Sequence, residues 1–366
     1  MKLEKGKKVV ILYTLIIVIL LVIGSLFAVT AYGINQIPKM TFDNMLAYTT
    51  KNNKKSIITV GIIQNGKTSC FLYGENGTAL PYSEHIYEIG SVTKTFTASL
   101  LFKAVNEGKI ELDDSINKYL DLPQRDYYPT IRRLITHTSG YKSYYLNKQT
   151  ISNTLHGKNS FYGISKNELI ECIKRTNLKD KDYSFNYSNF GIAVIGAVIS
   201  EIYKDEYTAL MNEFIKDELG LNKTKVSNSS GDLEKYWDWA ENDSYIPAGA
   251  LSSTIEDMLK YAQIQMDGTN TNISGTHEML AEVNASSAQY KKMNIHIDSI
   301  GAAWIIDKHN GIIWHNGGTG HYNSYIGFDK ENKIAVVILS NLPPNYRIPA
   351  TVMGIRLLVD LQKGNV

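Results

Sequence analysis

Strand-like segments lie at both ends of this 366-residue chain, and the part between them is helical in pattern. Near the start, residues 57–63 and 69–73 are strand-like and the Asn-Gly pair at 65–66 between them is typical of a hairpin turn. From about 110–290 the pattern is helical with many loops, and a final amphipathic helix follows Pro349. The later strand-like segments are 300–307, 312–315, 322–329 and 334–340. We therefore predict an α/β (α+β) fold: one antiparallel sheet flanked by helices, with an inserted all-helical region.

An apolar run precedes this folded part. Residues 9–29 contain no charged side chain. At about 1.5 Å of rise per residue, such a run spans the roughly 30 Å hydrocarbon core of a bilayer. Four lysines precede it, so the positive-inside rule keeps the N-terminus in the cytoplasm and places the rest outside. We predict a cytoplasmic tail at 1–8, one transmembrane signal anchor at 9–31, a linker or first helix at 32–55, and a single domain at 56–362.

A cleavable signal peptide is the alternative to the anchor, since Val29-Thr30-Ala31 is an acceptable small-residue cleavage site. The run is longer than the usual 7–15 residues of a signal peptide, which favours the anchor. Residues 1–33 carry four of the 38 basic and one of the 36 acidic residues, so the remainder is nearly neutral. This balance gives no electrostatic case for binding nucleic acid. Cys70 and Cys172 are each expected to pack as a small apolar side chain; a disulfide between them in an oxidising compartment is the alternative, which the presence of two cysteines does not decide.

The sequence Ser91-Val92-Thr93-Lys94 stands directly before an apolar helical pattern. Residues i and i+3 share a helix face, so the Lys94 ammonium can approach the Ser91 hydroxyl. The helix N-terminus favours negative charge that develops beside it. Two other Ser-x-x-Lys sequences, at 115–118 and 139–142, lie in turn-rich stretches without such a helix. Ser91 alone is equally expected to be a helix N-cap, but partners further along the chain favour a nucleophile.

Two later motifs supply those partners. Tyr187-Ser188-Asn189 runs into a nearly all-apolar helical segment, and His315-Asn316-Gly317 lies among the C-terminal strands. A serine hydroxyl is a weak nucleophile until a base removes its proton. Lys94 can be that base if burial lowers its pKa, and Tyr187 can be if flanking cations stabilise its phenolate. The three motifs together predict a serine acyl-transfer enzyme.

The remaining motif residues are expected to contact the substrate. Asn189 can donate a hydrogen bond to a substrate carbonyl and accept one from Lys94. Gly317 and Gly318 leave an open backbone that a substrate can approach closely. The backbone N–H groups of Ser91 and Gly318 would form an oxyanion hole, in which one donor is typically worth roughly 2.7–4 kcal/mol.

Other chemistries fit the chain poorly. It has no Gly-x-Ser-x-Gly elbow, which an α/β-hydrolase would need. His315 and His321 bracket a turn without a third ligand, so we expect no metal site. His137 is expected to order a loop rather than to catalyse.

These motifs resemble those of the serine β-lactamase and penicillin-binding protein family, specifically its class C-like branch. Ser91-x-x-Lys94, Tyr187-Ser188-Asn189 and His315-Asn316-Gly317 follow in the family's order, and the segments 134–140 and 247–258 resemble further signatures of the branch. The resemblance runs from about residue 55 to 345. It implies a β-lactamase/transpeptidase-like fold without a cofactor.

The resemblance also implies residue roles. Ser91 would be the acylated nucleophile, and Lys94 and Tyr187 the proton shuttles. Asn189 would contact the substrate amide. Residues 315–317 would bind substrate, and the N–H groups of Ser91 and Gly318 would form the oxyanion hole.

His315 departs from the best-known members, which carry a lysine there that pairs with a substrate carboxylate. Relatives with His-x-Gly include DD-carboxypeptidases, D-aminopeptidases and esterases. An unperturbed imidazole titrates near 6.5, so protonated His315 is expected to hold a terminal carboxylate, with KM rising from about pH 5.5 to 7.5.

The resemblance and the anchor together predict a membrane-anchored extracytoplasmic serine hydrolase of a bacterial cell, most simply a penicillin-binding DD-carboxypeptidase-like enzyme on cell-wall peptides. One alternative is an esterase or D-amino-acid-releasing hydrolase, such as a D-alanyl esterase on teichoic acid. Another is a non-catalytic envelope sensor or binding module. β-Lactams are candidate covalent inhibitors.

Overall fold

The structure, a computed structural model, describes residues 35–364. The predicted cytoplasmic tail and signal anchor therefore lie outside the described residues. Within 35–364, no helix combines the length and the apolarity that a membrane span requires. Helix α2 (Phe42–Thr50) occupies the segment that was predicted to be a linker or first helix, and the Thr41 side chain caps it.

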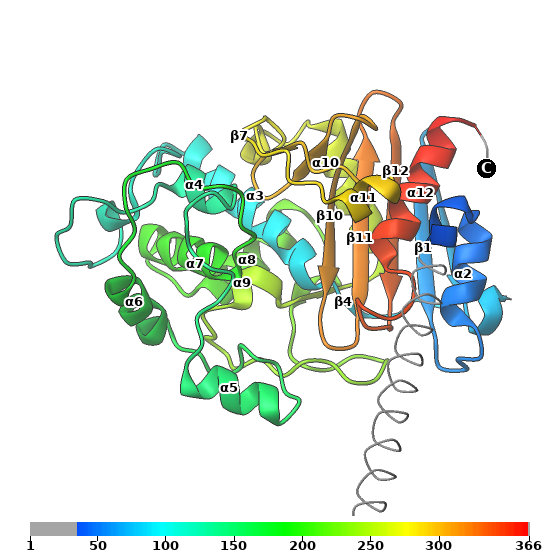
Figure 1. Cartoon of the computed structure of the whole chain (residues 1–366), viewed down its shortest axis with the longest axis horizontal. Coiled ribbons are helices and arrows are strands. Elements are labelled where there is room, and N and C mark those ends of the chain that lie inside the picture. The colour runs from blue at the N-terminus through cyan, green and yellow to red at the C-terminus, as the bar shows by residue number, and fades with distance from the viewer. Residues whose placement is uncertain (1–34, 365–366) are drawn as a thin grey trace, which may run out of the picture.

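The fold has two regions: a mainly helical one on the left of Figure 1, and the main sheet with the helices that cover it on the right. The strands are β1 (Ile58–Gln64), β2 (Lys67–Tyr73), β3 (Ala79–Leu80), β4 (Tyr87–Glu88), β5 (Lys225–Val226), β6 (Leu251–Ser253), β7 (Ala281–Glu282), β8 (Ser299–Ile300), β9 (Ile305–Asp307), β10 (Ile312–Gly318), β11 (Asn323–Asp329) and β12 (Ile334–Ser340). The α-helices after α2 are α3 (Thr93–Asn106), α4 (Ile131–Ile135), α5 (Lys148–Leu155), α6 (Lys166–Arg175), α7 (Asn189–Tyr203), α8 (Tyr207–Glu213), α9 (Ile246–Gly249), α10 (Ile255–Asp267), α11 (Ala288–Lys292) and α12 (Ala350–Gln362).

The main sheet has nine antiparallel strands in the order β3-β2-β1-β12-β11-β10-β9-β8-β7. The predicted hairpin forms β1 and β2, and β1 also pairs with β12, so Ile58 lies opposite Ser340. The first and last parts of the chain therefore meet in the sheet, as the strand-like ends predicted.

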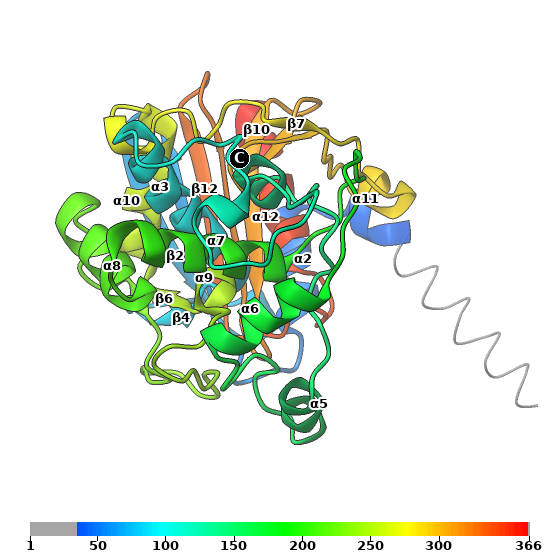
Figure 2. The ribbon, with the colours of Figure 1, turned by 90° about the vertical axis from the view of Figure 1, so that its left-hand side faces the viewer.

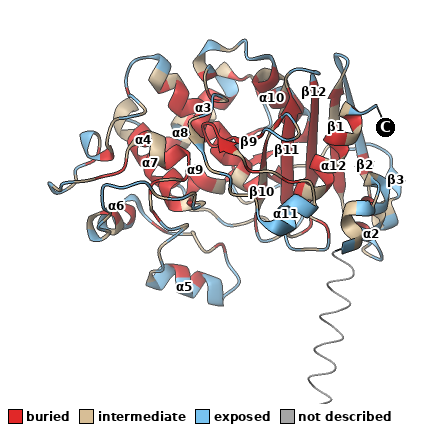
Figure 3. Ribbon diagram, turned by 45° about the horizontal axis from the view of Figure 1, so that its top comes forward, coloured by how far each residue is buried: buried red, intermediate tan, exposed pale blue. Residues whose placement is uncertain are grey.

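Helices cover both faces of this sheet, which explains why β11 and β12 are buried along their whole length. Successive residues of β12 face opposite sides because the side-chain period of a strand is two. Val336 and Ile338 pack in the core that includes α2 and α12, whereas Val337 and Leu339 pack in the core that includes α3 and α10. Figure 3 shows the central strands as buried along their length.

Two sequence predictions are wrong in detail. The segment 300–307 is not one strand: it folds back between β8 and β9, where the Gly301 N–H donates to the Trp304 carbonyl at 2.8 Å and Ala303 adopts a left-handed φ of 60°. The region 110–290 is not all-helical. Its strand β6 pairs with β5 and with β4 in a second, three-stranded sheet, and β7 joins the edge of the main sheet.

Helix α3 lies between the helical region and the sheet (Figures 1 and 2). Its Phe96 ring stacks on Tyr261 of α10 with centroids 3.8 Å apart. The 3₁₀-helix η3 (Gly90–Val92) leads into α3 and contacts β10. This packing places the start of α3 against the end of β10. Cys70 and Cys172 are unpaired and half-buried rather than fully buried.

Candidate active site

Ser91 lies in η3, two residues before α3 begins at Thr93. The Lys94 Nζ is 2.9 Å from Ser91 Oγ and also donates to the Ala248 carbonyl at 2.6 Å. Gly90 carries a φ of 49°, and a Cβ there would lie 2.5 Å from the Gly318 nitrogen. Only glycine therefore allows the backbone before Ser91 to approach β10 so closely.

Burial controls the charge of Lys94. Its side chain has no exposed surface, and burial alone shifts its pKa, with no contribution from a carboxylate within 35–364. Burial disfavours the ammonium, so the pKa of Lys94 lies well below its usual value. A neutral amine beside Ser91 Oγ can accept the serine proton, which is the chemistry required of a general base.

Tyr187 lies just ahead of α7, and the Lys94 Nζ is 4.9 Å from its ring centroid. Burial raises the pKa of Tyr187 above its usual value, and a hydrogen bond with Ser91 lowers it only in part. The prediction of a phenolate flanked by cations is therefore not supported, because burial disfavours both the Tyr187 phenolate and the Lys94 ammonium. Tyr187 is a protonated phenol that can donate a proton.

His315 is buried in β10, 1% exposed. Its Nδ1 lies 2.6 Å from the Asn316 carbonyl, an acceptor, so Nδ1 carries the proton and Nε2 carries the lone pair of the neutral ring. Burial and the nearby Lys94 lower the pKa of His315 to about 3, although the bond to Asn316 opposes this. The premise that His315 titrates near 6.5 is wrong, since its environment keeps the ring uncharged at neutral pH.

The His137 ring contacts the Tyr187 ring, with centroids 4.6 Å apart. Its Nδ1 accepts a hydrogen bond from the Ser188 N–H at 3.1 Å, so it orders the Tyr-x-Asn loop, as the sequence analysis expected. Burial, Lys94 and His315 all lower the pKa of His137. Neutral His137 therefore positions Tyr187 without adding charge.

The end of β10 offers a free backbone donor beside Ser91. The Thr319 N–H donates to the Tyr322 carbonyl, so in the alternating antiparallel ladder the Gly318–Asn323 pair is not hydrogen-bonded. The Gly318 N–H points away from β11, towards the Gly90 side. A Cβ at Gly317 would lie 1.9 Å from the Ile89 carbonyl oxygen, so this approach also needs glycine. The geometry suits an oxyanion hole made with the Ser91 N–H.

Asn189 is half-buried at the first position of α7, and its amide is 3.4 Å from Ser143 Oγ. The expected hydrogen bond from Lys94 is not found between these two described residues, because the Lys94 amine is directed to Ser91 and Ala248. The amide of Asn189 therefore makes no hydrogen bond with Lys94, and Asn189 remains a candidate substrate contact.

Glu88 is a site residue that the sequence analysis missed. Its buried carboxylate accepts from the Thr319 hydroxyl at 2.5 Å and from the Trp237 N–H at 2.7 Å. It thus joins the strand before Ser91 to the turn after β10 and to the 231–239 loop. Burial raises its pKa to about 7. A glutamate in a short strand carries no local signal of this role.

A cleft of about 390 Å³ opens over Ser91 and Tyr187. Its walls include Phe185, Tyr290 and Trp314, and Asn316, Gly317 and Gly318 also line it. None of its lining residues is Asp, Glu, Lys or Arg. The cleft is therefore apolar and uncharged apart from the hydroxyl, amide and backbone groups.

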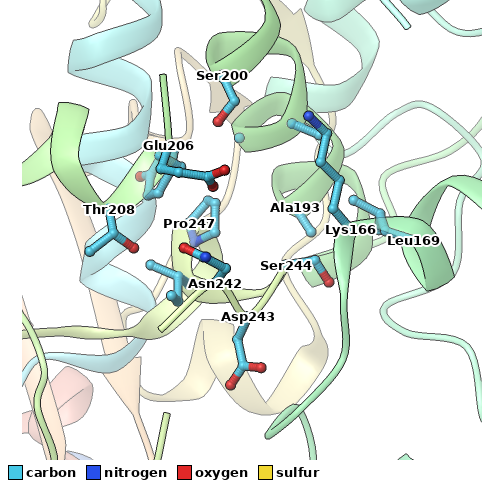
Figure 4. A pocket seen from close by; sticks show the side chains of 14 residues that line it. Lys166, Leu169, Ala193, Ser200, Glu206, Thr208, Asn242, Asp243, Ser244 and Pro247 are labelled. Atoms are coloured by element: carbon cyan, nitrogen blue, oxygen red, sulfur yellow. The ribbon is translucent and has the colours of Figure 1, made fainter. Parts of the chain in front are cut away.

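A second cavity, of about 40 Å³, borders α7, whose Ala193 and Ser200 line it (Figure 4). Lys166, Glu206 and Asp243 line it, but neither Ser91 nor Tyr187 does. The Asp243 carboxylate accepts from the Gly163 and Ala240 N–H groups and so organises loops. The cavity holds none of the motif residues.

Known proteins are similar to this chain in sequence. The chain is 23% identical to a β-lactamase of Providencia stuartii, over 90% of this chain and 94% of that protein. It is 21% identical to protein flp of Staphylococcus aureus (strain MRSA252), over 71% of this chain and 53% of that protein.

Solved structures share the fold. The penicillin-binding protein homologue from Pyrococcus abyssi superposes with a TM-score of 0.69 at 22% identity, over 87% of this chain and 75% of that one. A β-lactamase/D-alanine carboxypeptidase from Yersinia pestis gives 0.65 at 18% identity, over 90% and 98%. A D-stereospecific amidohydrolase from Streptomyces gives 0.64 at 18% identity, over 86% and 97%.

The family model described as Beta-lactamase matches residues 43–352, which is most of the chain. Within that span, Ser91, Lys94 and Tyr187 meet at one cleft. The protein therefore belongs to the β-lactamase family, in the group of serine hydrolases that includes the penicillin-binding proteins.

Proposed function

We propose that this protein is an extracytoplasmic, membrane-anchored serine hydrolase that acts through an acyl-enzyme. Its substrates carry no carboxylate at the reacting end, as in D-alanyl esters of teichoic acid. One observation carries the choice of substrate: the cleft over Ser91 contains no cationic side chain, and His315, at the position where relatives carry lysine, is uncharged. A buried carboxylate without a cation would be costly.

The chemistry follows from the positions of the three groups. In its unprotonated form, which burial favours, the Lys94 amine takes the Ser91 proton as Oγ bonds to the substrate carbonyl carbon. The carbonyl oxygen becomes an oxyanion held by the N–H groups of Ser91 and Gly318. As the bond to the leaving group breaks, the Tyr187 hydroxyl gives that group a proton and regains one from the Lys94 ammonium. Water then attacks the acyl-enzyme with the proton transfers reversed, and Ser91 is restored.

A DD-carboxypeptidase activity is the second candidate. It is favoured by the likeness to the Yersinia pestis protein, whose name includes D-alanine carboxypeptidase, and by Asn316, which lines the cleft and can donate a hydrogen bond to a carboxylate. In that case hydrogen bonds rather than an ion pair would hold the C-terminal group. A sensor without catalysis, the third expectation, would form no product.

A matched set of substrates separates these functions. One N-acylated D-alanyl group is presented as a methyl ester, as D-alanyl-D-alanine and as the carboxamide of that dipeptide. The proposal predicts that the ester reacts and that the carboxamide is cleaved at least as fast as the free dipeptide. A preference of tenfold or more for the free carboxylate would instead establish the carboxypeptidase. Mass spectrometry should find the acyl group on Ser91, with Ser91→Ala as the control.

A further inference from the structure

Helix α5 buries polar side chains and exposes apolar ones, the opposite of an ordinary surface helix. Thr150 and Asn153 are buried, at 1% and 4% exposure, and the Asn153 amide donates to the Tyr162 carbonyl at 2.8 Å. Ile151 and Leu155 share the opposite face, as residues i and i+4 do, and are 47% and 79% exposed. A surface helix normally buries its apolar stripe and exposes its polar one. The exposed face of α5 therefore suits an apolar environment outside the protein.

The apolar surface extends into the turn before α5, where Tyr144 and Leu146 are 46% and 69% exposed. Four of the ten large apolar side chains that are exposed in the described part of the chain lie in residues 144–155, which we name the docking segment. Figures 1 and 2 show α5 at the lower margin of the molecule, apart from the helices of the core. A cluster of exposed apolar side chains on a projecting helix is typical of an interaction surface.

Charge indicates the kind of partner. Residues 127–167 contain no aspartate or glutamate. Lys142, Lys148 and Lys158 are exposed beside or within the docking segment. Exposed apolar side chains surrounded by cations are the pattern of a helix that lies in the interface of an anionic bilayer. Each lysine near such a surface contributes about 1 kcal/mol of attraction.

The length of the chain outside the structure points to the same partner. Five residues, 30–34, separate the uncharged run at 9–29 from the first described residue. Even fully extended, they reach at most roughly 20 Å. If the run spans a membrane, the described domain must stay beside that membrane.

We propose that the docking segment inserts its apolar side chains into the outer surface of an anionic lipid bilayer and fixes how the domain lies on it. The proposal uses the predicted anchor for proximity and does not depend on which substrate is hydrolysed. Its test therefore measures the environment of the docking segment and not the hydrolytic activity.

The test uses the full chain in phosphatidylglycerol vesicles, with an environment-sensitive fluorophore on Leu155→Cys. Burial raises the thiol pKa of both native cysteines, so a brief reaction at neutral pH labels the introduced one first; the unsubstituted protein measures the background. The matched control is Leu80→Cys, an exposed leucine on β3. Nitroxide-labelled lipids report whether each fluorophore reaches the bilayer.

The expected result is a blue shift and lipid quenching at position 155 but not at position 80, both weakened in phosphatidylcholine vesicles or at high salt. Changing Lys142, Lys148 and Lys158 to glutamate should abolish the shift without altering thermal unfolding, since these side chains are exposed. Equal emission at both positions, or protein that does not float with the anionic vesicles, would overturn the proposal. So would a shift that follows protein density rather than lipid composition, because the partner would then be a second copy of the chain.

Discussion

Replacing Gly90 with alanine tests whether the Gly318 N–H stabilises the oxyanion. The new Cβ would lie 2.5 Å from the Gly318 nitrogen and 2.8 Å from its carbonyl carbon and oxygen, distances at which the backbone must shift. The φ of 49° adds strain of roughly 1–2 kcal/mol for a residue with a Cβ. The shift should move the Gly318 donor away from the substrate oxygen.

The loss of one oxyanion donor costs roughly 10²–10³ in kcat. We therefore expect Gly90→Ala to slow acylation by about this factor, and to lower Tm only modestly. The measurement is the single-turnover rate of acylation by a chromogenic ester or a fluorophosphonate, with Tm recorded on the same sample.

Gly249→Ala is the matched control. A Cβ at Gly249, on neighbouring α9, would meet only the Gly90 carbonyl carbon at 3.9 Å, an ordinary contact. This variant should acylate at the normal rate. If folded Gly90→Ala acylates within a few-fold of the wild type, the Gly318 N–H is not the donor that we infer, and the reasoning from β10 is refuted.

Three further outcomes are expected. A fluorophosphonate probe should label the wild type but not Ser91→Ala, and a labelled peptide from any other serine would contradict the assignment. KM for a carboxylate-bearing peptide should stay level from about pH 5.5 to 7.5, because His315 is uncharged throughout this range. His315→Lys should lower that KM and speed acylation by penicillin. A KM that rises with pH in the wild type would show that the ring is protonated. A carboxyl with a raised pKa stabilises the fold only while it is protonated, so the contribution of Glu88 to the free energy of unfolding should decrease as the pH rises from about 4.5 to 7. Glu88→Gln should remove this pH-dependent contribution. If chemical unfolding gives parallel curves of stability against pH for the two proteins, the reasoning is mistaken.

The sequence predicted those parts of the fold that have local signals. The hairpin of β1 and β2 has an Asn-Gly turn, and the apolar run after Asn189 forms α7. The motif residues Ser91, Lys94 and Tyr187 were also predicted to meet, because their order and context resembled those of a known family, and the structure brings them together.

The remaining features depend on contacts between distant segments. The fold-back at Ala303 requires a left-handed alanine, which no composition rule indicates. Strands of two or three residues, such as β5 and β6, are held by partners far along the chain. The second contact of Lys94 is the Ala248 carbonyl, 154 residues away, and the low pKa of His315 arises from burial that only the complete fold creates.

The pairing of β1 with β12 has a consequence for how the protein matures. A strand near residue 60 must wait for a partner near residue 337, so the sheet cannot close until the chain has been synthesised and has emerged as far as β12. Contacts between such distant segments make folding slow. The Gly318 backbone that flanks Ser91 belongs to the same late-arriving part. A chain that has emerged only as far as α10 would thus hold its nucleophile without its oxyanion donor, so hydrolytic activity would begin only after β10 has emerged and packed beside Ser91. A truncation before β12 would leave an aggregation-prone chain with an open strand edge.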